Sequence, residues 1–244
     1  AEFLEVARSK LAGFGQSVYW YRGHSCADWA LVPYVHRMYD GIGEHNLTAR
    51  FMLGAPTRHA RCPEISDLAG WICLMQHYGL PTRLLDWTGS PLIALFFAVS
   101  YDPEPGPAAI WVLVPSELNR ASGFKSAATF VLNGPEARAL LKAGFDEGPM
   151  VDEVLAVVGQ DLDLRMTVQQ AGFTLHGSGL PLESMPGANG YLAKFVIPET
   201  KKATLAEELW ALGIRRAGLF PDLGNLAVEL RTDSRLVPPA TART

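Results

Sequence analysis

Residues 76–99 read QHYGLPTRLLDWTGSPLIALFFAV and hold the densest group of polar side chains beside an apolar run in this sequence. A Gly-Leu-Pro turn divides the first half, which predicts a helix end, a turn and a strand. The second half opens with Ser90-Pro91 and continues without charge, which favours a helix that supports the core. The candidates for chemistry here are His77, Tyr78, Thr82, Arg83, Asp86, Trp87 and Thr88.

A second strong signal lies upstream, where SVYWYRGHS spans residues 17–25. Its aromatic and β-branched residues favour a strand, and Arg22-Gly23 ends that strand with a cation. Arg22 is either an ordinary surface cation or a clamp for an anion. Apolar spacing then predicts helices over 43–52 and 65–76, the second beginning near Glu64 or Ser66.

The remaining elements are less rich in chemistry. Strands are predicted at 108–114 and 191–197, with β character at both ends of 165–175 and a late strand that carries Glu229. Helices are predicted at 2–13, 135–143, 152–158 and 200–212. The glycine- and proline-rich segment HGSGLPLESMPGANG, residues 176–190, has the composition of a flexible lid.

The chain has 244 residues, of which 48% are hydrophobic, and this is enough for one large core. We expect a single domain over 1–232 and a disordered tail over 233–244. The order of the elements favours an α+β fold, a single mixed domain, over a doubly wound sheet, because no glycine-rich phosphate loop follows a strand.

The net charge of -4 argues against bulk attraction to nucleic acid or anionic lipid, although a local basic groove stays open. The cysteines, Cys26, Cys62 and Cys73, are odd in number and lack C-x-x-C spacing, which disfavours a disulfide framework or a zinc ribbon. The histidines show no metal-binding spacing. Without a leader or a long apolar stretch, we expect a cytoplasmic protein with no membrane partner.

Several of these motifs together resemble the FRG domain family. They are Tyr21-Arg22-Gly23, the whole of residues 76–99, RMTVQQAGFTLHG at 165–177 and LFPDLGNLA at 219–227. The resemblance extends over most of the chain and is carried mainly by the long central motif. The family records a motif more than a reaction, so it implies little chemistry by itself.

A weaker resemblance is to the mono-ADP-ribosyltransferases, which place an arginine on a first core strand and Ser-Thr-Ser before a helix. Arg22 is similar to that arginine, and Asp86-Trp87-Thr88, on an expected strand over 84–88, stand where the family has Ser-Thr-Ser. The triplet therefore departs from the family, and its catalytic glutamate has no assigned counterpart. The resemblance implies a split β core with surrounding helices, and NAD as the substrate.

Cleavage of NAD passes through a cationic sugar, which needs electrostatic stabilisation more than a strong nucleophile. The resemblance implies that Arg22 grips the pyrophosphate, with Asp86 and Gln169 near the ribose and Glu183 or Glu229 as acidic substitutes. We expect Arg22, Asp86 and Gln169 to converge on one cleft. The residues expected to bind NAD are Tyr21, Arg22, Gly23, His77, Tyr78, Thr82, Arg83, Trp87, Thr88 and Phe173.

Each candidate also has a structural interpretation. His77 could cap the end of a helix. Arg83 and Asp86, three residues apart, could form an ion pair that supports the fold. Trp87 and the apolar run after Pro91 fit a core better than a cofactor surface.

The sequence thus leads to two hypotheses. The first is an NAD-dependent ADP-ribosyltransferase or NAD glycohydrolase, a toxin or defence effector with a protein or nucleic-acid acceptor and a cognate inhibitor as a further expected partner. The second is a non-catalytic or nuclease-like module that uses Arg22, Arg37 and Arg83 to bind nucleic acid, or that binds a partner protein.

Overall fold

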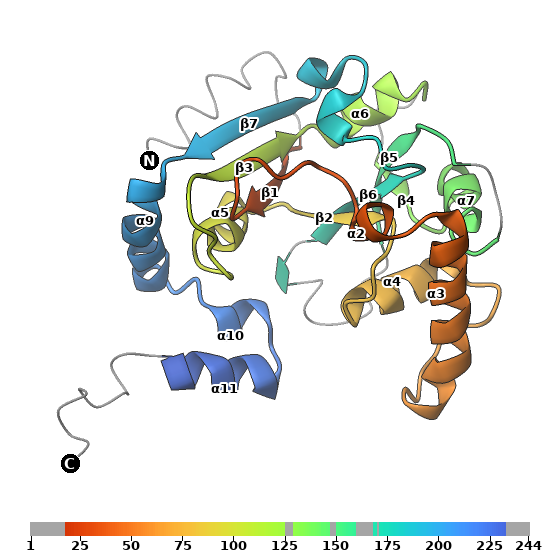
Figure 1. The fold of residues 1–244 in the computed structure, drawn as a ribbon, viewed down its shortest axis with the longest axis horizontal. Helices are drawn as coiled ribbons and strands as arrows, with labels where there is room; N and C mark the ends of the chain where they lie inside the picture. Colours follow the sequence, from red (N-terminus) through yellow and green to blue (C-terminus); the bar gives the residue numbers. More distant parts are fainter. Residues whose placement is uncertain (1–17, 125–128, 147–149, 160–167, 170, 233–244) are drawn as a thin grey trace.

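The computed structural model describes residues 18–124, 129–146, 150–159, 168–169 and 171–232 (Figure 1). Seven strands form one sheet in the order β4-β5-β6-β2-β1-β3-β7. β4 and β5 run parallel, and the other neighbours in the sheet pair antiparallel. The mixed sheet and its helices confirm the α+β fold.

The strands are β1 (Trp20–His24), β2 (Leu84–Thr88), β3 (Ala108–Leu113), β4 (Phe130–Val131), β5 (Val154–Val158), β6 (Ala171–His176) and β7 (Leu192–Ile197). The α-helices are α2 (Tyr34–Met38), α3 (Gly41–Gly54), α4 (Leu68–His77), α5 (Pro91–Val99), α6 (Pro115–Ala121), α7 (Pro135–Lys142), α9 (Glu199–Ala211), α10 (Arg216–Leu219) and α11 (Leu223–Thr232). Short 3-10 turns are η2 (Ala55–Thr57), η3 (Leu182–Ser184) and η4 (Ala188–Gly190).

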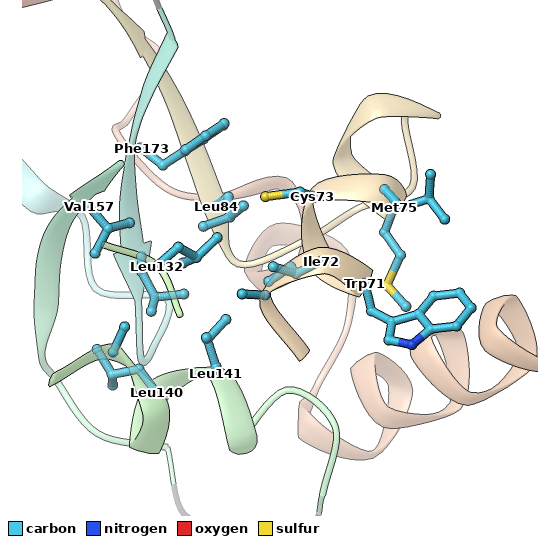
Figure 2. Close-up of a cluster of buried hydrophobic side chains, with 14 of the residues drawn as sticks. Trp71, Ile72, Cys73, Met75, Leu84, Leu132, Leu140, Leu141, Val157 and Phe173 are labelled. Atoms are coloured by element: carbon cyan, nitrogen blue, oxygen red, sulfur yellow. The ribbon is translucent and has the colours of Figure 1, made fainter. Parts of the chain in front are cut away.

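One face of the sheet carries two apolar clusters side by side. Around Leu84 and Phe173, side chains of α4 and α7 pack on β2, β5 and β6 (Figure 2). Around Phe96 and Val112, α5 and α9 pack on β3 and β7. Leu84 and Thr88 lie four residues apart on β2, so their side chains point to the same face of the sheet. Thr88 is aligned with Tyr21 of β1, which is aligned with Val112 of β3. Both clusters therefore cover the same face.

The opposite face carries a third cluster, which is rich in tryptophan. Trp20, Trp87 and Trp111 come from β1, β2 and β3 and are each nearly buried. The segment predicted as a lid packs here through Leu182, which has no exposed surface. This anchoring corrects the lid prediction, because a fully buried leucine fixes the segment to the core on this face.

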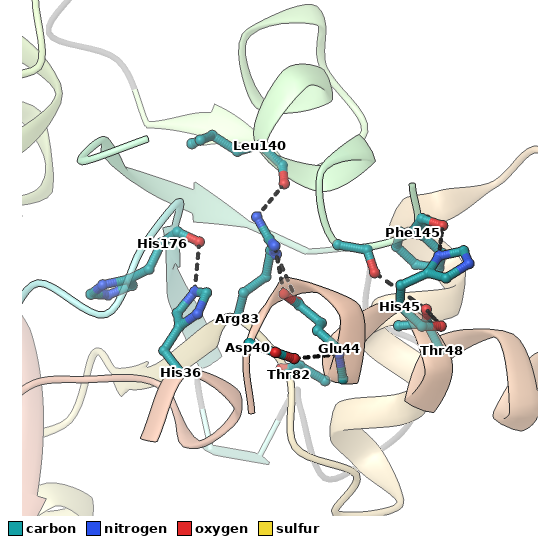
Figure 3. Close-up of polar contacts among 12 residues, drawn as sticks. His36, Asp40, Glu44, His45, Thr48, Thr82, Arg83, Leu140, Phe145 and His176 are labelled. Carbon is teal, nitrogen blue, oxygen red and sulfur yellow. Dashed lines mark hydrogen bonds and ion pairs between the residues drawn. The ribbon is translucent and has the colours of Figure 1, made fainter. Parts of the chain in front are cut away.

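A buried ion pair joins α3 to the start of β2 (Figure 3). Arg83 donates from Nε and Nη2 to the two carboxylate oxygens of Glu44, at 2.8 and 2.6 Å, and from Nη1 to the Leu140 carbonyl at 2.8 Å. The side chains of Arg83 and Glu44 are only 1% and 4% exposed. The predicted pair of Arg83 with Asp86 is therefore wrong, because Arg83 lies inside the fold with another partner.

Three further predictions of secondary structure are wrong. Residues 152–158 were expected to be helical, but Val154–Val158 form β5, because the β-branched run VLAVV pairs with strands on both sides and is buried between them. Glu229 lies on helix α11 rather than on a strand. The start of α4 is capped by Asp67, whose carboxylate accepts from Gly70 N, in place of Glu64 or Ser66.

Other expected elements are observed. Helices α3, α4, α5, α7 and α9 and strands β1, β2, β3, β6 and β7 lie within a few residues of the predicted ranges. The helix predicted at 2–13 and the tail at 233–244 lie outside the described residues. The single domain over 1–232 stays a prediction.

Glu44→Gln leaves the buried Arg83 guanidinium without its countercharge. We expect the free energy of unfolding to fall by about 3–5 kcal/mol, measured by urea denaturation at neutral pH. Glu117→Gln is the matched control, because Glu117 pairs with Arg120 on the surface, and an exposed pair contributes only about 0–1 kcal/mol. Equal losses in the two variants would contradict a structural role for Arg83.

Candidate functional site

Strands β1 and β2 lie together at one point and then diverge. Tyr21 is aligned with Thr88, whereas β1 is aligned with β3 from Trp20 to His24 and β2 with β6 from Leu84 to Thr88. Beyond that point the side chain of Arg22 bridges the strands, and its Nη1 donates to the Asp86 carbonyl oxygen at 2.6 Å. The sheet therefore contains a local opening in which a guanidinium replaces backbone pairing.

A pocket of about 170 Å³ lies at this opening. Arg22, Asp86 and Gln169 all line it, although they are far apart in the sequence, so the expected convergence on one cleft is observed. The full lining is Tyr21, Arg22, Gly23, Asp86, Trp87, Thr88, Phe97 and Gln169. The pocket thus combines a cation, a carboxylate and an amide with aromatic walls.

The orientation of Arg22 is fixed from a second side by His24. Arg22 Nε donates to His24 Nε2 at 3.1 Å. Burial, and then the positive charge of Arg22, lower the pKa of His24 to about 3, so that its imidazole is neutral and accepts the hydrogen bond. Burial also lowers the pKa of Arg22, an effect that Asp86 opposes, and the guanidinium stays charged. Nη2 of Arg22 has no hydrogen-bond partner within the described residues and can bind an anion.

A short chain of side-chain hydrogen bonds holds the carboxylate of Asp86. Gln76 Nε2 donates to Asp86 Oδ2 at 2.8 Å, and Gln76 Oε1 in turn accepts from Thr82 Oγ1. Thr82 is buried and lies outside the pocket lining. Thr82 therefore does not face the pocket, contrary to the prediction that it binds NAD. It orients the side-chain amide of Gln76, which in turn holds the carboxylate of Asp86.

Gln169 closes the pocket from the other side of β2. Its backbone carbonyl accepts from Thr88 Oγ1 at 2.6 Å, and its Nε2 donates to the Leu219 carbonyl of α10 at 3.0 Å. The side-chain donor is thereby occupied by the fold. The side-chain oxygen of Gln169 has no partner among the described residues. It can therefore accept a hydrogen bond from a ligand hydroxyl.

Gly23 is required by packing as well as by the pocket. A Cβ on Gly23 would lie 1.9 Å from the carbonyl oxygen of Ala94 and 2.7 Å from the amide nitrogen of Ala98. Both atoms belong to the backbone of α5, which therefore lies in direct contact with β1. The Tyr-Arg-Gly motif thus joins a pocket cation to the residue that lets a helix pack beside it.

Several predicted residues lie elsewhere because the core or another surface uses them. Arg83 does not line the pocket, because its guanidinium is held by Glu44. Phe173 is 3% exposed and belongs to the cluster around α4 and α7. Tyr78 lines a different pocket, where its hydroxyl lies 3.3 Å from His59 Nδ1, and its ring also packs edge-on against His77 at the end of α4.

The two acidic substitutes also support the fold. Both carboxylate oxygens of Glu183 accept from Leu31 N, at 3.3 and 3.1 Å, beside the tryptophan-rich face. Glu229 Oε2 accepts from Ala217 N at 2.7 Å in the first turn of α10. Neither lines the pocket, so both predictions of a catalytic glutamate are corrected.

Trp87 lines the pocket but belongs mainly to the core. Its side chain is 2% exposed, and Nε1 donates to Thr174 Oγ1 at 3.0 Å. The sequence did not predict three residues of the site. His24 and Gln76 hold lining residues in place, and Phe97 lines the pocket itself. His24 could have been found, because it lies two residues after Arg22 on the same strand face.

Two general properties follow from the described residues. Among them, no three His, Cys, Asp or Glu side chains gather closely enough to hold a metal ion. No helix in the described ranges has both the length and the apolar character that crossing a bilayer requires.

Gly23→Ala forces a methyl group against the backbone of α5. We expect a loss of about 3 kcal/mol in the free energy of unfolding, measured by urea denaturation, because backbone atoms cannot move aside without shifting the helix. Gly41→Ala is the control, since a Cβ there meets no atom within 4 Å and alanine favours the helix. Unchanged stability of Gly23→Ala would contradict the observed packing.

His176 makes stability depend on pH. It is fully buried, its Nε2 lies 2.9 Å from Thr174 Oγ1, and burial lowers its pKa to about 3. In the unfolded chain His176 binds a proton as the pH falls through about 6.5, whereas in the folded chain it stays neutral until the pH is near 3. The free energy of unfolding is therefore greatest above pH 6.5 and falls as the pH drops towards 3.

His176→Asn removes this titration. We expect the slope of unfolding free energy against pH, measured by urea denaturation between about pH 4 and 6, to become shallower by up to about 1.4 kcal/mol per pH unit. An unchanged slope would mean that His176 binds a proton equally in both states.

The comparisons with known proteins bear on the first half of the chain. Residues 17–105 match the family model of the FRG domain. No curated protein and no solved structure matches. The matched region runs from just before β1 to the turn after α5, and Gln169 lies outside it. The part of the chain that is similar to the FRG domain therefore supplies every residue of the pocket lining except Gln169.

Proposed function

We propose that the pocket at the opening between β1 and β2 binds NAD and cleaves its nicotinamide–ribose bond. The observation that carries the proposal is the convergence of Arg22, Asp86 and Gln169 on one pocket. Their chemistry fits the needs of this reaction, which are an anion clamp, a negative charge beside a developing sugar cation, and a hydroxyl acceptor.

The reaction requires no strong nucleophile from the protein. As the bond breaks, nicotinamide leaves with the electron pair and the ribose becomes an oxocarbenium ion. Water, or a group on a protein or nucleic acid, then adds to that carbon and loses a proton. Asp86 is held by Gln76 and carries a carboxylate that stabilises the cationic sugar without attacking it.

Arg22 provides the anchor for the rest of the dinucleotide. His24 and the Asp86 carbonyl use Nε and one hydrogen of Nη1, so that the orientation of the guanidinium is fixed before a ligand arrives. The remaining donors suit a pyrophosphate, which guanidinium binds bidentately. Preorganisation of this kind lowers the entropy cost of binding.

The size and the walls of the pocket select one end of NAD. A volume of about 170 Å³ is below the several hundred typical of a site that encloses a whole drug-sized ligand. The pocket therefore takes the nicotinamide riboside end, and the adenosine half lies over the surface. The rings of Tyr21 and Phe97 are available to pack against nicotinamide.

A nucleic-acid-binding module is the less favoured alternative. Of the three arginines on which it rests, Arg83 is paired inside the fold with Glu44. Arg37 is exposed, and its charge contributes to the lowered pKa of Arg22. With a net charge of -4 as well, the pocket fits a small anionic substrate better than a long polyanion.

The test is incubation with NAD and measurement of released nicotinamide by chromatography. We expect Arg22→Lys to lower the rate at least about tenfold, because lysine cannot bind bidentately. Asp86→Asn keeps an oxygen for Gln76 but removes the charge, and should lower the rate about a hundredfold. Arg231→Lys, an exposed change on α11, is the matched control and should keep the wild-type rate.

Thermal melting of each variant separates lost catalysis from lost folding. No nicotinamide and no NAD-dependent rise in melting temperature for the wild type would reject the proposal. A salt-dependent gel shift of labelled RNA or DNA that Arg22→Ala abolishes would instead support the alternative.

A further inference from the structure

A second and larger pocket lies between α3 and the end of α4. Its volume is about 610 Å³, within the range typical of small-molecule sites. It shares no lining residue with the pocket at β1 and β2. The lining residues are Leu47, Arg50, Phe51, Gly54, Ala55, Arg58, His59, Leu74, Tyr78 and Leu80.

The floor of this pocket is part of the hydrophobic core. Leu74 is 6% exposed and belongs to the cluster around α4 and α7, and Phe51 and Leu80 pack against that cluster. Such a floor is apolar, and its side chains pack against the core behind them. It can bury the apolar body of a ligand, which gains free energy in proportion to the area removed from water.

The charged groups of the lining are all positive. They are Arg50 and Arg58, and no aspartate or glutamate lines the pocket. Arg58 Nη1 is held by the Gly54 carbonyl at 2.7 Å and by Thr57 Oγ1 at 2.9 Å, so its position is fixed. Arg50 is exposed and forms no ion pair within the described part of the chain.

Tyr78 adds a hydroxyl to this basic side. Its oxygen lies 3.3 Å from His59 Nδ1, and the two rings pack edge-on with centroids 5.9 Å apart. Tyr78 is 59% exposed although it belongs to the central motif of the sequence. A large exposed aromatic beside an apolar pocket is typical of a binding surface.

We propose that this pocket binds a small amphipathic carboxylate, such as a fatty acid, with its chain on Leu47, Phe51 and Leu74 and its carboxylate at Arg50. An apolar chain matches the floor, and a single negative group matches the basic side. The inference does not depend on NAD cleavage, since it uses a separate pocket.

Isothermal titration calorimetry with dodecanoate, below its critical micelle concentration, tests the proposal, and dodecanol is the uncharged probe of equal length. We expect saturable binding of dodecanoate at one site and binding of dodecanol weaker by at least about tenfold. Arg50→Gln should remove most of that preference. Arg231→Gln, the same change on exposed α11, should leave it intact.

Leu47→Trp fills the pocket without removing a charge. We expect it to weaken dodecanoate binding at least about tenfold while the thermal melting curve stays close to that of the wild type. Equal affinity for dodecanoate and dodecanol, or binding that Leu47→Trp leaves unchanged, would overturn the proposal. A dimer in sedimentation that Leu47→Trp dissociates would also overturn it, by assigning the pocket to a second copy of this chain.

Discussion

The contact between Gly23 and the backbone of α5 is the constraint on which the candidate site depends. A side chain at position 23 would overlap Ala94 O, so α5 can approach β1 this closely only over glycine. The approach places Phe97 of α5 beside Arg22 and Asp86, where β1 and β2 diverge. The motif Tyr-Arg-Gly therefore works as a unit, in which one residue carries charge and the next sets the distance to the helix.

The central stretch divides its chemistry among the core and two pockets. Asp86, Trp87 and Thr88 line the pocket at β1 and β2, whereas Tyr78 lines the one between α3 and α4. Arg83 lies between them in the sequence but is buried against Glu44. A buried guanidinium with both carboxylate oxygens and a carbonyl as partners is costly to expose, so this arginine anchors α3 to the sheet and offers nothing to a ligand.

Polar residues next to the pocket mainly orient the side chains that line it. Neutral His24 accepts from Arg22, and Thr82 orients Gln76, which donates to Asp86. These hydrogen bonds set the orientation of the cation and the carboxylate before any ligand binds. The same logic explains why Gln169 is held through both its backbone carbonyl and its side-chain amide nitrogen.

The sequence by itself determined the α+β class and most elements with strong periodicity, because local propensity carries that information. The convergence of Arg22, Asp86 and Gln169 was expected from the family resemblance, and the tertiary structure brings the three residues to one pocket. Only the tertiary structure decided which polar residues are exposed. Arg83 found Glu44 thirty-nine positions away, and Glu183 and Glu229 found backbone amides on other segments. Such partners are fixed by how helices and strands pack. Residues 154–158 form a strand for a related reason, since the β-branched run of β5 pairs with a neighbouring strand on each side.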